Sequence, residues 1–335
     1  MEITETLRQL TELGGVSGDE LNISGAAAEL LREYADEVSV DPFGNVTGFV
    51  RAENPAQPVA MLDAHLDRIG MRVTYIDEKG FLKAGAAGGL DMRVLLAQSV
   101  TVWGKAPVKG VVSTLPPHVS KDHSTVPEIG DISIDIGMTK EEAEKLVSLG
   151  DAITVNGSFR KLCAGRVSAA AADDRCGICA VLRALELLNG KKPSKTVAVS
   201  FSAQEETGER GVKQTAFRIM PDEAIAVDVS FGRTPDSAPH ETAELGSGVM
   251  IGFSAALDKE MSQKLLCIAE EKGIPHTCEV MPSTTGTNAD AAGVSGKGVK
   301  CATLSVPIRY MHTAVETVDP ADIEAAARLM YEYIK

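Results

Sequence analysis

The stretch Val59-Ala60-Met61-Leu62-Asp63-Ala64-His65-Leu66-Asp67 determines the fold class expected for this chain. An apolar run of strand length ends in a histidine and an aspartate, as in a buried strand that delivers polar side chains at its end. The same pattern recurs where residues 196–203 lead into Glu205-Glu206, and where residues 224–227 lead into Asp228. Because strand ends gather on one edge of an open α/β sheet, these side chains are expected to converge.

Two more stretches bring polar residues to the same expected edge. Asp173 and Asp174 precede an apolar helix expected over residues 178–188, and His312 follows the apolar run 304–311. The alternation of strands and helices near the start of the chain resumes after Arg166. The main sheet is therefore expected to contain strands from both ends of the chain, which predicts an α/β fold.

Residues 70–163 have a different texture. Short alternating strands, for example at residues 132–136, stand among many turn residues, and one helix is expected over residues 140–149. We therefore predict a small β-rich domain, residues 70–163, inserted into a larger discontinuous domain of residues 1–69 and 164–335.

Helical periodicity and turn residues predict other elements at the two ends of the chain. A helix is expected over residues 27–34, and a final helix over residues 320–335 begins with Pro320, a residue favoured in the first turn. The single tryptophan, Trp103, is expected to be buried in the β-rich segment.

Composition excludes several classes of protein. The chain has 335 residues, 44% of them hydrophobic, with a mean hydropathy of +0.01, which is ordinary for a globular protein. A net charge of −14 argues against nucleic-acid or anionic-membrane partners, because both require a basic surface. Without a membrane-spanning apolar stretch or the features of a signal peptide, the predicted location is the cytoplasm.

The six cysteines do not predict a disulfide framework. Cys176 and Cys179 have C-x-x-C spacing, but no second pair completes a zinc knuckle, and Asp173 and Asp174 would raise a thiol pKa. We expect reduced, packed thiols. The histidines outside the strand-end pattern are expected to be surface or packing residues, and they are His118, His123, His240 and His276.

The adjacent carboxylates carry the chemical signal. Pairs at Asp173-Asp174 and Glu205-Glu206 beside apolar elements would repel one another and be desolvated, and two divalent cations would remove that cost. A mixture of imidazole and carboxylate suits zinc, cobalt or manganese. His65 is a candidate ligand, and Asp67, on the same strand face, could orient it. Sequence neighbours such as Glu205 and Glu206 cannot flank a scissile glycosidic bond, which argues against a glycosidase.

Five motifs together resemble the tetrahedral, or TET-type, dinuclear metallo-aminopeptidases, which are also classed as glutamyl aminopeptidases and sometimes as cellulases. The similarity extends over essentially the whole chain. The motifs are His65-Leu66-Asp67-Arg68-Ile69-Gly70, Ala172-Asp173-Asp174-Arg175, Gln204-Glu205-Glu206-Thr207-Gly208-Glu209-Arg210-Gly211, Val227-Asp228-Val229 and Ile308-Arg309-Tyr310-Met311-His312-Thr313, and the segment Pro116-Pro117-His118 also matches.

The resemblance implies a ligand set for two divalent cations, expected to be zinc, cobalt or manganese. Asp173 would bridge the two cations. His65 and Asp228 would complete the site of one, and Glu206 and His312 that of the other.

The resemblance also implies the remaining roles. Glu205 would act as general base toward a metal-activated water, and Asp67 would orient His65. The fold would be a mixed-sheet zinc-peptidase-like domain, with residues 70–163 as a PDZ-like assembly domain. The implied activity is removal of N-terminal residues from short peptides by a homo-oligomer, either a dimer or a dodecameric shell.

Two other functions remain open from the residues alone. A dinuclear deacylase or carboxypeptidase would use the same ligands with an arginine for the substrate carboxylate, and Arg68, Arg175 and Arg309 are candidates. A metal-binding scaffold without activity is the other, although Glu205 would then have no role. Arg68 replaces the usual family glutamate and residues 286–291 are a stretched family segment, so both are expected to affect substrate preference. We expect the loops at 246–252 and 282–290 to shape the specificity pocket.

Overall fold

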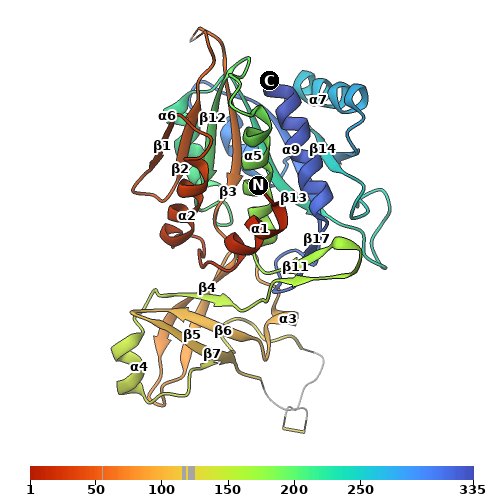
Figure 1. Ribbon diagram of the computed structural model, residues 1–335. Coiled ribbons are helices and arrows are strands. Elements are labelled where there is room, and N and C mark those ends of the chain that lie inside the picture. The colour runs from red at the N-terminus through yellow and green to blue at the C-terminus, as the bar shows by residue number, and fades with distance from the viewer. Residues whose placement is uncertain (55, 115–117, 120–124) are drawn as a thin grey trace.

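The largest element of the computed structural model is an eleven-stranded mixed sheet (Figure 1). The structure describes residues 1–54, 56–114, 118–119 and 125–335, so Pro116, Pro117 and His123 lie outside the described residues. The strand order is β1-β2-β12-β3-β13-β16-β17-β11-β10, and β14 pairs with β16 and with β15. The strands are β1 (Glu37–Val40), β2 (Val46–Val50), β3 (Val59–His65), β10 (Arg160–Lys161), β11 (Val167–Ala169), β12 (Thr196–Ser202), β13 (Glu223–Phe231), β14 (Val249–Ser254), β15 (His276–Met281), β16 (Lys300–Arg309) and β17 (Glu316–Val318).

The middle of the sheet is parallel. Strands β12, β3, β13 and β16 run in the same direction, and β3 and β12 align with His65 opposite Ser202. All seven residues of β12 are buried, as are all of β3 except the half-buried Val59, which is the pattern of strands covered on both faces. The carboxyl ends of these strands therefore meet at one edge. The prediction of an α/β protein with a mixed sheet is confirmed.

Helices cover both faces of this sheet. Helices α1, α5 and α9 lie on the near face in Figure 1, and Leu62 on β3 belongs to the same buried cluster as Ile178 on α5. Met61, one residue earlier, points to the opposite face and clusters with Val212 and Ala289. The helices are α1 (Ile3–Thr11), α2 (Leu21–Leu31), α5 (Ala172–Leu188), α6 (Arg210–Ile219), α7 (Lys259–Lys272), α8 (Asn288–Gly293) and α9 (Pro320–Ile334), with a 3-10 turn η1 (Cys163–Gly165).

The β-rich segment forms a closed six-stranded barrel below the sheet in Figure 1, in the order β4-β5-β8-β7-β6-β9. Its core includes Met71, Val102, Ile134 and Ile153, all buried. The β-rich texture is thus confirmed in the form of a barrel. Its elements are β4 (Gly70–Ile76), β5 (Leu82–Ala87), α3 (Met92–Leu95), β6 (Ser99–Trp103), β7 (Pro107–Val112), β8 (Ile134–Asp135), α4 (Lys140–Leu146) and β9 (Ala152–Val155).

Several predicted element boundaries were wrong. The helix predicted over residues 27–34 is α2, which begins at Leu21 because Ile23 already belongs to its buried stripe. The helix predicted to reach residue 149 ends at Leu146, where Val147 turns to extended backbone. The strand expected at residues 132–136 retains only the two residues of β8.

Trp103 is half-buried rather than buried, because its ring packs at the joint between barrel and sheet. Its indole N–H donates to Thr154 Oγ1 (3.0 Å), and the ring packs against a small cluster that includes Val16, from the N-terminal segment. The cysteine prediction is confirmed in part. Cys176, Cys179 and Cys301 are buried and the other three cysteines are exposed, but all six are free thiols.

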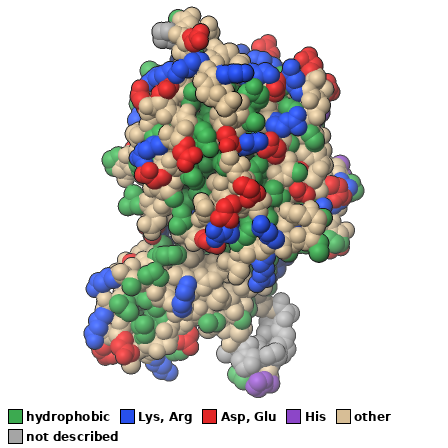
Figure 2. Space-filling view, in the orientation of Figure 1, with side chains coloured by type: hydrophobic (Ala, Val, Ile, Leu, Met, Phe, Trp, Pro, Cys, Tyr) green, Lys and Arg blue, Asp and Glu red, His purple; other side chains and the backbone are tan. Residues whose placement is uncertain are grey.

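The surface carries charged side chains of both signs. Figure 2 shows Lys and Arg interspersed with Asp and Glu over both the sheet and the barrel on the face drawn. Among the described residues, no helix has the length and apolar character needed to cross a membrane. His118 and His240 are exposed and His276 is half-buried, as expected for histidines outside a functional cluster.

Candidate metal centre

The strand ends deliver the predicted side chains to one edge of the sheet. His65 is the last residue of β3, Glu205 and Glu206 follow β12, and Asp228 lies near the end of β13. Asp173 enters from the first turn of α5, where its backbone is not yet helical. The structure thus brings together side chains that are far apart in the sequence.

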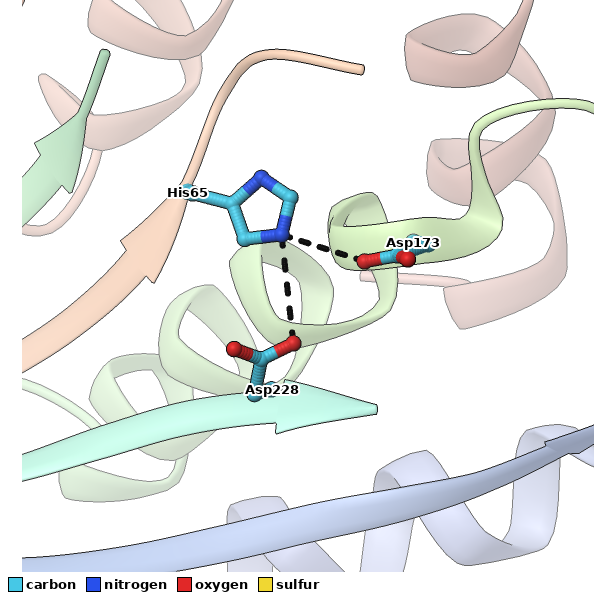
Figure 3. Close-up of side chains that lie close together, drawn as sticks. All are labelled: His65, Asp173 and Asp228. Carbon is cyan, nitrogen blue, oxygen red and sulfur yellow. Dashed lines mark hydrogen bonds and ion pairs between the residues drawn. The ribbon is translucent and has the colours of Figure 1, made fainter. Parts of the chain in front are cut away.

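His65 and two carboxylates form the first ligand group. The Nε2 atom of His65 lies 3.1 Å from Asp173 Oδ1 and 3.8 Å from Asp228 Oδ1. Figure 3 shows the imidazole reaching from β3 toward both carboxylates. All three residues are buried, and one ligand atom from each lies within 4.8 Å of the others. This spacing is compatible with one shared cation.

His312 and Glu206 form the second group with the other oxygen of Asp173. His312 Nε2 lies 3.2 Å from Asp173 Oδ2 and 3.4 Å from Glu206 Oε1. The three ligand atoms again lie within 4.8 Å of one another. His312 has a left-handed φ of 62°, a conformation that is uncommon outside glycine and recurs at functional sites. Asp173 therefore presents one oxygen to each group.

Asp67 makes a different contact from the one predicted. Its backbone carbonyl, not its carboxylate, is 3.0 Å from His65 Nδ1, and the nearest carboxylate oxygen is 3.6 Å away. The carboxylate instead accepts hydrogen bonds from the backbone N–H groups of Glu205 (2.9 Å) and Glu206 (3.1 Å). An Nδ1–H that donates to the carbonyl leaves Nε2 with its lone pair facing Asp173 and Asp228, as a metal ligand requires. Asp67 thus holds both His65 and the Glu205-Glu206 turn.

Glu205 lies beside the first group without belonging to it. Its Oε2 atom is 4.0 Å from His65 Nε2, and its side chain is 11% exposed. Asp174, in contrast, points into the protein. Its carboxylate accepts from the backbone N–H groups of His65 (3.2 Å) and Gly177 (3.0 Å), so it supports the backbone of the site.

Glu316 is a functional residue that the sequence analysis missed. Its two carboxylate oxygens accept the backbone N–H groups of His312 (2.9 Å) and Asp173 (3.2 Å), so one side chain fixes the backbone of two candidate ligands. The available signal was a glutamate between Val315 and Thr317, four residues after His312.

The charges of the site are unbalanced in the protein alone. Burial raises the pKa of Asp228 to about 8 against the influence of His65, and Asp173 adds to the increase. Burial likewise holds the pKa of Glu205 well above its usual range, against the effect of His65. Burial would also raise the pKa of Asp173, but hydrogen bonds from His312 and His65 outweigh it and lower that pKa. Two imidazoles among four mutually repelling carboxylates fit a pair of divalent cations, which would compensate the repulsion.

The three arginines considered for carboxylate binding differ in their surroundings. Arg175 is fully buried and donates to the carbonyl oxygens of Leu13 and Gly14, both at 2.8 Å. Arg309 donates to the backbone carbonyl of Arg233 and lies 3.7 Å from the carboxylate of Glu244. Arg68 lines a cavity of about 280 Å³, and the candidate ligand His312 lines the same cavity. Of the three arginines, Arg68 is therefore the best placed to meet a substrate.

Comparison with known proteins identifies relatives along the whole chain. The M42 glutamyl aminopeptidase family matches residues 44–329. A lysyl aminopeptidase of Pyrococcus furiosus is 32% identical over 97% of this chain and 94% of its own.

Solved structures are similar to the same extent. An aminopeptidase from the archaeon Desulfurococcus kamchatkensis superposes with a TM-score of 0.94 at 33% identity, covering 99% of this chain and 94% of its own. The TET1 peptidase of Pyrococcus horikoshii, described as assembling into a tetrahedron or a large octahedral shell, gives a TM-score of 0.87 at 32% identity and covers 99% of each chain. The sequence, the fold and the strand-end cluster agree, and this chain belongs to the M42 glutamyl aminopeptidase family.

Proposed function

We propose that this chain, a metal-dependent aminopeptidase, removes N-terminal residues from short peptides with two divalent cations held by a shared aspartate. The observation that carries the two-cation proposal is the position of Asp173, whose two oxygens face His65 and His312 separately. His65 and Asp228 would complete one cation site, and Glu206 and His312 the other. Zinc, cobalt or manganese suits this donor set.

The chain's own residues have separable tasks in the hydrolysis. When bound, the cations supply Lewis acidity for the scissile carbonyl and the attacking water. Glu205 takes the proton from that water and returns it to the leaving amine. The Asp67 carboxylate positions Glu205 by accepting a hydrogen bond from the Glu205 backbone N–H, and the Asp67 carbonyl orients His65. Glu316 keeps Asp173 and His312 in place from behind.

The proposal extends to domain organisation and assembly. Residues 1–69 and 164–335 would form the catalytic domain, and residues 70–163 a PDZ-like domain that mediates association into dimers or a dodecameric shell. The assembly of the Pyrococcus horikoshii relative supports this part. An enclosed shell would limit substrates to short peptides, and we propose that the protein acts in the cytoplasm.

The test is release of chromophore from a panel of aminoacyl-p-nitroanilides. The protein is first treated with a chelator, and zinc, cobalt or manganese is then restored. We expect restored cleavage of free-amine substrates and none of their N-acetylated forms. Cleavage of N-acyl amino acids instead would favour the deacylase, with Arg68 as the residue for the substrate carboxylate. Inactivity toward every substrate despite bound metal would contradict an enzymatic function.

A further inference from the structure

A second cavity, of about 820 Å³, is lined by Phe231, which lies three residues beyond Asp228 on β13. It is bounded by the end of β13, by β15, and by the loops at 239–247 and 282–284. These include two of the loops expected from the sequence to shape specificity. Its apolar wall includes Phe231, Met250, Val280 and Met281.

One half-buried carboxylate, Glu279 on β15, lines this cavity. It accepts hydrogen bonds from the hydroxyl groups of Ser230 and Ser305, the latter at 3.1 Å. Ser305 aligns with Asp228 on the neighbouring parallel strand, and Ser230 lies two residues beyond Asp228 on the same face of β13. Since neighbouring strands lie about 4.8 Å apart, the Ser305 hydroxyl group that binds the Glu279 carboxylate belongs to the residue adjacent to Asp228.

Glu279 has no positive partner within the described part of the chain. No Lys, Arg or His nitrogen there lies within 4.0 Å of its carboxylate, so hydroxyl groups alone compensate its burial. Arg233, the one arginine of the lining, is already engaged, because it pairs with Glu244 (3.3 Å) and donates to the Pro239 carbonyl (2.8 Å). A half-buried carboxylate that lines a cavity and has no cationic partner marks a place where a ligand can supply the opposite charge.

The shape and charge of the cavity indicate the chemistry of that ligand. Its walls offer apolar contact to an aliphatic chain, and Glu279 offers a carboxylate to a cation next to the reacting end of the substrate. Glu241 at the rim adds negative charge, whereas Glu244 is paired with Arg233 (3.3 Å) and Arg309 (3.7 Å). A side chain with an apolar stem and a positive end matches both features, as in lysine and arginine.

We propose that the Glu279 cavity receives the side chain of the substrate's N-terminal residue and selects lysine or arginine. This inference rests on the proposed aminopeptidase function and names its substrate class. Glu279 is a specificity residue, and it takes no part in bond cleavage.

The experiment compares two substrates that differ mainly in the ammonium group. Lysyl and norleucyl amidomethylcoumarin are cleaved by the metal-loaded protein, and kcat/KM is measured for each. We expect the wild-type protein to favour lysine by about tenfold or more, and Glu279→Gln to lower that ratio by about 10- to 100-fold, the usual worth of a hydrogen bond to a charged group. Glu279→Asp, which keeps the charge, should still favour lysine. Binding of L-lysine, measured by calorimetry, should weaken in Glu279→Gln.

Glu241→Gln is the matched control, since the Glu241 side chain is 71% exposed at the rim of the same cavity. It should leave the ratio within about twofold, because exposed charges contribute little. An equal effect of Glu241→Gln and Glu279→Gln would overturn the inference in favour of general surface charge. A wild-type preference for norleucine would also overturn it, while leaving the aminopeptidase function intact. Absence of cleavage with every free-amine substrate would contradict both proposals.

Discussion

Two groups of buried or half-buried carboxylates in this molecule have opposite surroundings. Asp67 and Asp322 each accept two backbone N–H groups, from Glu205 and Glu206 in one case and from two glycines at 2.8 and 2.7 Å in the other. The edge carboxylates, by contrast, face one another and two imidazoles, and they are Asp173, Glu205, Glu206 and Asp228.

This difference separates the carboxylates that stabilise the fold from those that we expect to bind metal or to act in catalysis. A carboxylate that accepts hydrogen bonds from fixed N–H groups recovers much of its desolvation cost and stabilises the backbone that donates them. A carboxylate that faces other carboxylates recovers little of its desolvation cost until a cation binds. The first group should therefore stabilise the protein with or without metal, whereas the second should stabilise it only with metal.

The largest effect is expected for Glu205→Gln. The amide keeps the shape of the side chain but cannot accept the proton, so kcat should fall on the order of 10²- to 10⁴-fold. Both cations should remain bound, as measured by elemental analysis of the dialysed protein. Retention of more than a tenth of the activity would contradict the role of Glu205 as base. Loss of metal from this variant would instead place Glu205 among the ligands.

Asp67→Asn tests a carboxylate of the other group. An amide oxygen can accept from one of the two N–H groups of the Glu205-Glu206 turn, but its NH₂ would face the other. We expect kcat or metal affinity to fall about 10- to 100-fold, as for other residues that position ligands. The metal-free variant should also unfold at a lower urea concentration. Unchanged stability together with full activity would mean that the two hydrogen bonds contribute nothing.

Asp228→Asn should have the opposite effect on the stability of the metal-free protein, which it should increase. Burial raises the pKa of Asp228 to about 8, so removing this carboxyl group should stabilise the chelated protein by about 1 to 2 kcal/mol. With zinc present the same change should weaken metal binding. Urea unfolding with and without chelator measures both effects. Asp322→Asn is the control, since it loses an acceptor for Gly246 or Gly248 and should destabilise both forms by about 1 to 3 kcal/mol.

The sequence predicted the site better than it predicted the surroundings of the site. His65, Asp228 and the Glu205-Glu206 pair follow apolar runs of strand length, and the parallel order of β12, β3 and β13 brings such ends together. The division of these side chains between two cations came from the resemblance to a family.

Contacts between distant segments could not be predicted from local patterns. The closure of the barrel depends on the pairing of β4 with β9, about eighty residues apart, which leaves no periodicity in either strand. The position of Glu316 behind two candidate ligands, and the contact of Glu279 with Ser305, depend on strand register in the same way. The carboxylate of Asp67 was assigned to His65 because strand alternation placed both on one face, but the chain leaves the strand at His65.

The smallest effect is expected in the pH dependence of stability, again through Asp322. Burial raises the pKa of this carboxyl to about 6, even though Gly246 and Gly248 donate to it. Because the folded form then holds its proton more tightly than the unfolded chain, whose aspartates titrate near about 3.9, stability is lost as pH rises from about 4 to about 6. We expect this loss to be about 1 kcal/mol and to be absent in Asp322→Asn, measured by urea unfolding across that range. Asp322 accepts hydrogen bonds from Gly246 and Gly248, neither of which is a candidate ligand, so the same difference should appear with and without chelator, whereas any contribution of the edge carboxylates should disappear when zinc is bound. A pH dependence that vanished with zinc and survived in Asp322→Asn would assign the effect to the edge carboxylates and remove Asp322 from the explanation.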